Sequence, residues 1–268
     1  MGAALAGYFG SDSQKRLQAL AEAGADEIAA TAGLCQAGRT MGCDDPDALG
    51  PERIGACLER DGICGFRLIT PDQAARLRAW LETRGFRLDT WNVYLADRET
   101  TLAACLPILD GGLPDGLCEL DAPLSPEGDA TRRIQAMMSA AGVVPFSGSM
   151  LSGDVGPAIT VALADGAGTI AASAHAYLPH NAASRHRSHA WGGLVAVDPA
   201  HRGKGLGRLV NALMAVRAFR ELGASHIYEL VSASNEVSRR MVEACGLRHA
   251  PELVCGLATR EAAARFTR

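Results

Sequence analysis

The stretch that most constrains this chain is residues 194–207, which read LVAVDPAHRGKGLG. It opens with an uninterrupted apolar run, residues 194–197, which is typical of a strand buried on both faces. From Leu206 onward, apolar residues recur at spacings of three and four until Gly223, which indicates a helix. The stretch therefore predicts a buried strand, a basic glycine-rich loop and a helix in immediate succession.

The loop before that helix has the composition of an anion-binding site. The first N–H groups of a helix lack intrahelical partners and lie at the positive end of the helix dipole. Three glycines keep side chains away from these donors, and three basic residues add positive charge. The six residues are Arg202, Gly203, Lys204, Gly205, Gly207 and Arg208. A phosphate or pyrophosphate is the expected ligand; the alternative is an ordinary strand-to-helix turn with solvated basic residues.

Spacing excludes two other phosphate-binding patterns. The sequence contains no Gly-x-x-x-x-Gly-Lys-Ser/Thr, so the loop is not a P-loop. The dinucleotide pattern Gly-x-Gly-x-x-Gly would require glycine at the position of Arg208. ATP is disfavoured as a ligand because no lysine–serine pair or Mg²⁺-binding carboxylate follows the loop.

The pattern Arg202-x-x-Gly205-x-Gly207, preceded by a Val-x-Val strand and Asp-Pro, resembles the acyl-CoA pyrophosphate loop of the GNAT superfamily of N-acetyltransferases. Downstream, a strand over residues 225–231, an asparagine, a helix and a glycine follow in the order of the family. The resemblance covers roughly residues 117–257. It implies an α/β fold with a mixed sheet, a central splayed strand and a helix that begins at the pyrophosphate loop.

The resemblance also implies acetyl-CoA as cosubstrate and assigns residues to it. In the family, the exposed backbone of the central strand pairs with the pantetheine arm, and the loop amides hold the pyrophosphate. The matching residues here are Val195, Ala196, Val197, Arg202, Gly203, Lys204, Gly205, Leu206, Gly207 and Arg208. Asn235 matches an asparagine that often contacts the cofactor near the thioester; a helix N-cap is its alternative role.

The catalytic groups of the family match less well. Val242 stands where relatives often have the tyrosine that protonates the departing thiolate. Many relatives carry a glutamate five residues before the asparagine; that position is Leu230, and Glu229 is its neighbour. A shift of one residue turns a strand side chain to the opposite face unless a bulge intervenes. Glu229 is therefore a candidate base, with a buried structural carboxylate as the alternative.

His189 is the second candidate base. It shares strand parity with Trp191, on the face that would look into the acceptor cleft, and imidazole titrates near neutral pH. The alternative is a solvated histidine at the end of a strand. Arg185 and Arg187 nearby would repel a cation, so no metal is expected, and they could favour an anionic acceptor.

Residues 1–114 are expected to form a smaller α/β region, and residues 115–268 the acyltransferase domain. A strand over residues 63–69, a helix that begins after a capping box at Thr70, and a strand over residues 86–95 repeat the order of the second half. The first region is therefore a degenerate GNAT-like unit without the CoA motif, or an unrelated α/β extension. Residues 35–50 are expected to be loop, and residues 107–116 a linker.

Composition narrows the partners and the compartment. A net charge of −4 argues against general nucleic-acid binding, and no apolar stretch approaches the ~18 residues of a membrane span. The eight cysteines include no Cys-x-x-Cys pair, and the first residues lack the pattern of a signal peptide. The expected location is the cytoplasm, with reduced thiols.

The sequence thus predicts an N-acetyltransferase that moves an acetyl group from acetyl-CoA to a primary amine by direct attack in a ternary complex. The alternative is a non-catalytic acyl-CoA-binding sensor or scaffold, motivated by Val242. The expected partner is a small-molecule or peptide amine, without nucleic acid or membrane, and a homodimer is left open.

Overall fold

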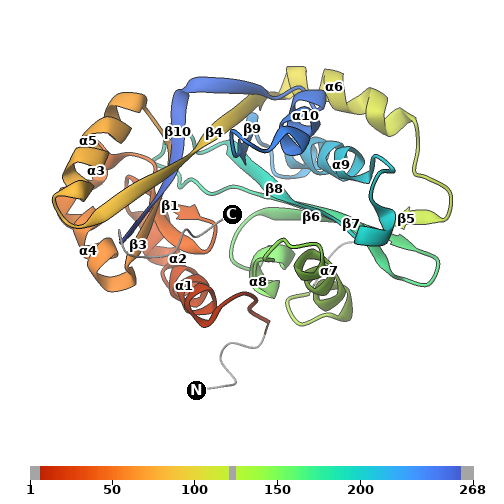
Figure 1. The fold of residues 1–268 in the computed structure, drawn as a ribbon, viewed down its shortest axis with the longest axis horizontal. Coiled ribbons are helices and arrows are strands. Elements are labelled where there is room, and N and C mark those ends of the chain that lie inside the picture. Colours follow the sequence, from red (N-terminus) through yellow and green to blue (C-terminus); the bar gives the residue numbers. More distant parts are fainter. Residues whose placement is uncertain (1–6, 121–124, 261–268) are drawn as a thin grey trace.

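The computed structural model describes residues 7–120 and 125–260, which form a mixed α/β structure around one large sheet (Figure 1). The order of its ten described strands is β1-β2-β3-β10-β4-β9-β8-β7-β6-β5. The strands are β1 (Leu34–Ala37), β2 (Thr40–Cys43), β3 (Ile63–Ile69), β4 (Phe86–Asp97), β5 (Leu117–Glu119), β6 (Ala158–Asp165), β7 (Ile170–Tyr177), β8 (His189–Val197), β9 (His226–Val231) and β10 (Arg248–Arg260). The predicted fold class is confirmed.

Ten α-helices lie within the described ranges. They are α1 (Asp12–Ala23), α2 (Ala25–Ala30), α3 (Pro46–Leu49), α4 (Pro51–Asp61), α5 (Pro71–Glu82), α6 (Arg98–Asp110), α7 (Asp129–Ala140), α8 (Gly148–Ser152), α9 (Leu206–Glu221) and α10 (Glu236–Ala244). The predicted capping box at Thr70 is present, because its hydroxyl accepts from the Gln73 amide while the Gln73 side chain accepts from the Thr70 amide. Over the described residues, no helix is long and apolar enough to cross a membrane.

Of two predictions about irregular segments, one is wrong and the other, the linker over residues 107–116, holds only for residues 111–116. Residues 35–50 are not loop, because they contain the hairpin β1–β2 and the short helix α3. Because this segment is rich in cysteine and glycine, it lacks the alternation of apolar and polar residues that usually indicates a strand. Residues 107–110 belong to the last turn of α6 rather than to a linker. Pro107 lies inside this helix, although it has no N–H to donate to the carbonyl of Ala103, so the sequence pattern there resembled a break.

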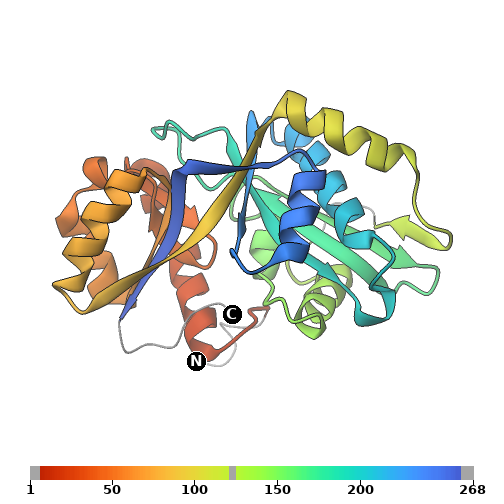
Figure 2. The ribbon, with the colours of Figure 1, turned by 45° about the horizontal axis from the view of Figure 1, so that its top comes forward.

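Side-chain parity along β4 separates the two faces of the sheet. Phe86, Leu88 and Tyr94 belong to the apolar clusters under α4, α5, α6 and α9, whereas Trp91 and Val93 lie on the opposite face. Figures 1 and 2 show α9 and α10 together on one face of the C-terminal strands, and α7 and α8 on the other. The sheet is therefore covered on both sides.

The strands β8 and β9 diverge soon after they begin. Among the described residues they pair in parallel at three positions, from His189 with His226 to Trp191 with Tyr228. On its other side β8 remains paired with β7 up to Val197, with one extra residue inserted near Leu194, whose φ is +50°. This bulge and the divergence leave one edge of β8 without a strand partner.

The last strand, β10, lies between β3 and β4 and is antiparallel to both. Figure 1 shows β10, in blue, among the orange strands of the first region. β3 carries Leu68 at φ +52°, as β8 carries Leu194, and each of these strands is followed by a helix and a parallel strand. This repeat supports a degenerate first unit. In that unit β10 fills the gap between β3 and β4, whereas the corresponding gap between β8 and β9 stays open. The boundary at residue 114 stays a prediction, since the sheet is continuous across it.

The segment after β7 fastens the first region to the second. The Asn181 amide nitrogen donates to the carbonyls of Ile28, Thr31 and Leu34 at 2.8, 2.7 and 3.0 Å. Asn181 is buried, so these bonds are shielded from water. The two N–H groups of one side chain are thus shared among three backbone acceptors at the end of α2 and the start of β1.

We expect Asn181→Ala to lower the free energy of unfolding by about 2–3 kcal/mol, because it leaves buried carbonyls without their donor. Asn235→Ala is the matched control: it removes only the bond from the Asn235 side chain to the Ser238 amide at the start of α10 and should cost about 1 kcal/mol. Urea unfolding of both variants measures the difference, and equal losses would contradict this role for Asn181.

Candidate active site

The loop before α9 has the geometry of an anion site. Gly205 is the N-cap residue at φ +76°, and Gly203 has φ +78°. A Cβ at either position would meet no protein atom within 4 Å, so backbone conformation, rather than space within the protein, requires the glycines. Within residues 7–120 and 125–260 no side chain caps the helix, and its first turn contains no acidic residue. The first amides of α9 are therefore free to bind an anion.

A cavity of about 600 Å³ lies in front of this helix N-terminus, between β8 and α10; we call it the loop cavity. Its walls include most of the residues predicted to bind the cofactor. These are Val195, Ala196, Val197, Arg202, Gly203, Gly205, Leu206, Gly207 and Arg208. Around Gly207, atoms of Met241, Val197 and Val195 would lie 3.6–3.9 Å from an added Cβ, so the helix start sits close to both the strand and α10.

Two of the predicted cofactor residues do not line the loop cavity. Lys204 is exposed beside it, and Asn235 is the N-cap of α10, where its side chain accepts from the Ser238 amide at 3.0 Å. Asn235 thus has its alternative role, and its contact with a cofactor stays a prediction. On α10, Val242 is buried in the core under the sheet, and Met241 is the residue that faces the cavity.

A second cavity, of about 240 Å³, is lined by Trp191 and Leu194 of β8; we call it the tryptophan cavity. The two cavities are lined by consecutive residues of β8, since Leu194 lines the tryptophan cavity and Val195 the loop cavity. Leu230 of β9 contributes the facing wall, so the second cavity opens at the divergence of the two strands. The other side chains around it include Arg39, Arg67, Trp91, Phe146, Trp191 and Leu257.

Glu229 lies on the other face of β9. Its carboxylate accepts from the Asn211 side chain of α9 at 2.8 Å and is buried, whereas its neighbour Leu230 faces the tryptophan cavity. No bulge in β9 restores the parity. Burial raises the pKa of Glu229 to about 7, against the opposing effect of the Asn211 hydrogen bond. The position fits the structural alternative better than the role of base.

His189 lies at the closed end of the pair β8–β9. Its ring stacks on His226 at 4.4 Å between centroids and meets His186 edge-on at 5.0 Å. Burial, helped by the neighbouring histidines, lowers the pKa of His189 to about 3. A base with such a pKa is weak near neutral pH. His189 also lies five residues along β8 from Leu194, away from the mouth of both cavities.

A buried cluster joins the two regions beside this histidine group. Asp44 accepts from His180 at 2.7 Å and from Ser184 at 2.6 Å, and His180 meets the Tyr228 hydroxyl at 3.3 Å. Burial acts to raise the pKa of Asp44, but these hydrogen bonds bring it below its ordinary value. The ligand atoms of Cys35, Asp44 and His180 lie within 4.8 Å of one another. The hydrogen bonds of His180 and Asp44 explain why these side chains lie close together, so we interpret the cluster as structural.

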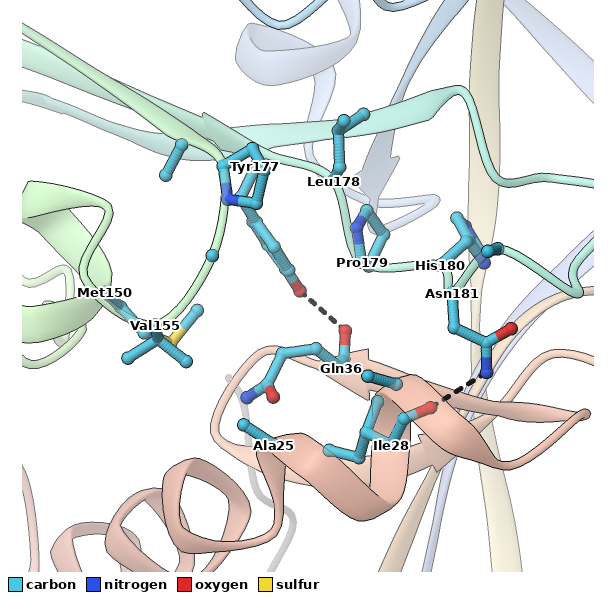
Figure 3. Close-up of a pocket in the computed structure, with 15 residues that line it drawn as sticks. Ala25, Ile28, Gln36, Met150, Val155, Tyr177, Leu178, Pro179, His180 and Asn181 are labelled. Carbon is cyan, nitrogen blue, oxygen red and sulfur yellow. Dashed lines mark hydrogen bonds between the residues drawn. The ribbon is translucent and has the colours of Figure 1, made fainter.

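A third cavity, of about 260 Å³, lies between α2, β1 and the segment after β7 (Figure 3). The Tyr177 hydroxyl points across it and donates to the Gln36 carbonyl at 2.9 Å, and the same hydroxyl accepts from the Gly38 amide at 2.8 Å. Its described lining contains no Lys, Arg, Asp or Glu. Its histidine, His180, is already bonded to Asp44 and Tyr228.

Sequence reasoning missed the two arginines of the tryptophan cavity. Arg39 lies in the turn of the unpredicted hairpin β1–β2, and Arg67 lies inside β3. A charged residue in the apolar run ICGFRLI was the available signal, since an unpaired charge in a buried strand is unusual. The predicted anion-favouring residues, Arg185 and Arg187, are exposed and line neither cavity.

The raised pKa of Glu229 predicts how stability depends on pH. The folded protein binds this proton more tightly than the unfolded chain, whose ordinary value is 4.5, so stability falls as pH rises from about 4.5 to 7. Glu229→Gln keeps an acceptor for Asn211 and removes the titration. Relative to this variant, the wild type should lose about 2–3 kcal/mol between pH 5 and pH 8 in urea unfolding. Glu236→Gln, on exposed α10, controls for the loss of a carboxylate; a difference for Glu229→Gln that does not change with pH would contradict the assignment.

Three solved structures share this fold. A GCN5-related N-acetyltransferase from Kribbella flavida is 14% identical, with a TM-score of 0.54 over 83% of this chain and 78% of that one. A Drosophila protein is 15% identical, with a TM-score of 0.57 over 94% and 90% of the two chains. A tandem GNAT protein from the clavulanic acid biosynthesis pathway is 12% identical, with a TM-score of 0.53 over 84% and 76%. At these identities the likeness concerns the fold.

No curated protein sequence matches the chain. Residues 145–247, which run from the edge of the tryptophan cavity through the loop of α9 to α10, match the acetyltransferase (GNAT) family. The family supports acyl transfer as the general chemistry. Over residues 145–247 the chain is therefore similar in sequence to the acetyltransferase (GNAT) family.

Proposed function

We propose that the protein transfers an acetyl group from acetyl-CoA to a primary amine by direct attack in a ternary complex. The observation that carries the proposal is the unpaired edge of β8, which leads from the free amides of α9 to the tryptophan cavity. An extended, anion-tailed donor fits this path, because an unpaired strand edge binds an extended chain and a helix N-terminus binds phosphate.

Each end of the donor then has its own residues. The amides from Gly203 to Arg208 hold the pyrophosphate, with Arg202 and Arg208 adding positive charge at the cavity wall. The backbone of Val195 and Val197 pairs with the pantetheine arm. The thioester consequently reaches the mouth between Leu194 and Leu230. There the amine nitrogen attacks the thioester carbonyl, a C–N bond forms, the C–S bond breaks, and the proton lost from nitrogen balances the released thiol.

The walls of the tryptophan cavity set how that proton leaves. Its described lining contains no carboxylate and no imidazole. Desolvation and the nearby guanidinium groups both disfavour an ammonium ion there, so the acceptor enters as the neutral amine and water carries the proton away. The same observation favours a second candidate, a non-catalytic acyl-CoA-binding module, and turnover separates the two.

The test compares two glycines of the same helix. Gly205→Glu places a carboxylate in the anion site, and we expect acetyl-CoA binding to weaken by about 100-fold or more, equivalent to roughly 3 kcal/mol. Gly223→Glu is the matched control, since Gly223 at the other end of α9 has a similar φ of +66° and equally open surroundings. Acetyl-CoA binding is measured by calorimetry, and thiol release is measured over a panel of amines.

Thiol release that depends on an amine, persists in Gly223→Glu and disappears in Gly205→Glu would support the enzyme. Tight acetyl-CoA binding without turnover on any amine would move the binding-module candidate ahead. Equal acetyl-CoA binding by both variants, or none by the wild type, would overturn the proposal.

A further inference from the structure

The tryptophan cavity contains two arginines without a counter-ion. Arg67 is 8% exposed, and its neighbours are neutral: one terminal nitrogen approaches the Phe66 carbonyl at 3.5 Å, and the guanidinium contacts the Tyr177 hydroxyl. Arg39 donates to the carbonyls of Val144 and Pro145, and its guanidinium lies 5.0 Å from the centre of the Phe146 ring. Across residues 7–120 and 125–260 neither arginine has a carboxylate within 4.0 Å.

Other partly buried arginines of the chain show the contrast. Arg217 lies between Glu119 at 2.7 Å and Glu221 at 2.6 Å, and Arg87 pairs with Asp89 at 3.1 Å. Burying a guanidinium without such a partner is unfavourable by several kcal/mol. A pair of uncompensated arginines at one cavity is therefore explained best by an anion that the cavity binds.

The polar side-chain atoms that lack a hydrogen-bond partner around the cavity are all of one kind. Among its lining residues, buried side-chain atoms without a hydrogen-bond partner in the described structure are Arg39 Nε, Arg67 Nε and Trp191 Nε1. All three are donors. The cavity consequently lacks acceptors, which a carboxylate supplies in a form that matches the guanidinium fork.

The rest of the wall is apolar, and the space is small. Trp91, Phe146, Leu194, Leu230 and Leu257 surround the polar atoms. A volume of about 240 Å³ is below the ~300–1,000 Å³ of typical ligand pockets, which favours a compact acceptor over a peptide or an oligosaccharide. The apolar wall suits an apolar or aromatic substituent on that acceptor.

We infer that the acceptor is a small amino acid-like amine, in which a carboxylate binds Arg67 and Arg39 and an apolar side chain packs against the tryptophans. The inference rests on the proposed function, since it names the substrate class of the same site. The carboxylate holds the amine at the mouth between Leu194 and Leu230, where the thioester arrives. Arg67 acts on binding and positioning, and it makes no contact with the acetyl group.

The first arm of the test is turnover with matched substrates. Thiol release from acetyl-CoA is measured with apolar amino acids and with their carboxamides, which differ only in the anionic group. We expect kcat/KM for at least one amino acid to exceed that of its amide by about 100-fold or more, the usual effect of leaving a buried charge unpaired. Arg67→Gln should raise the KM for the amino acid by a similar factor while the Kd for acetyl-CoA stays within about threefold. Arg187→Gln, on the exposed loop, is the matched control.

The second arm needs neither turnover nor a variant. Two of the three tryptophans of the chain, Trp91 and Trp191, line the cavity, so their fluorescence reports on its occupancy. The probes are the N-acetyl derivatives of alanine, valine, leucine, methionine, phenylalanine and tryptophan, each beside the corresponding N-acetyl amide. Binding of the tryptophan derivatives is measured by calorimetry, because these probes fluoresce themselves. Binding of the acids but not of the amides is the expected result.

The outcomes separate the two proposals. Amides or simple amines that react as well as the amino acids would overturn the inference and leave acyl transfer intact. N-acetyl amino acids that bind while no amine gives turnover would support the anion site and count against the proposed function. Absence of binding by every N-acetyl amino acid at 10 mM, on the order of the weakest useful affinity, would overturn the inference directly.

Discussion

The divergence of β8 from β9 is the constraint on which the candidate site depends. The two strands pair at their beginnings, and the bulge at Leu194 turns β8 while it stays paired with β7. An edge of β8 is left with backbone donors and acceptors that need partners, because unpaired backbone groups are costly away from water. Both cavities open at this edge, and the N-terminus of α9 points to one end of it. The separation of these two strands thus exposes a strand edge on which an extended ligand can bind, and both cavities lie along that edge.

The parts that could be predicted from sequence are those whose chemistry is local. A strand, a turn with φ-positive glycines and a helix start lie within fourteen consecutive residues, so the loop of Gly203 and Gly205 was readable as an anion site. The cap at Thr70 and the Asn235 cap are likewise determined by neighbours three residues away. Such features depend on hydrogen bonds between residues a few positions apart, so the sequence order was enough.

The acceptor side could not be predicted for the opposite reason. Arg39, Arg67, Trp91, Trp191 and Leu230 come from five different strands or turns, and only the sheet order brings them together. The site therefore depends on pairings such as that of β10 with β3 and β4, which no local pattern reveals. For Glu229 the sequence did raise the decisive question, the parity of β9, and the contact with Asn211 answers it.

The position of β10 also has a consequence for how the chain is made. Its partners β3 and β4 are separated from it in sequence by more than residues 145–247, yet they pair through β10 rather than with each other. During synthesis, the first region therefore emerges with an unfilled slot in its sheet and with exposed strand edges, a known aggregation hazard. It can close only when residues 248–260 leave the ribosome. Because β10 pairs with both β3 and β4, a chain truncated before residue 248 would leave the first region incomplete as well as the second.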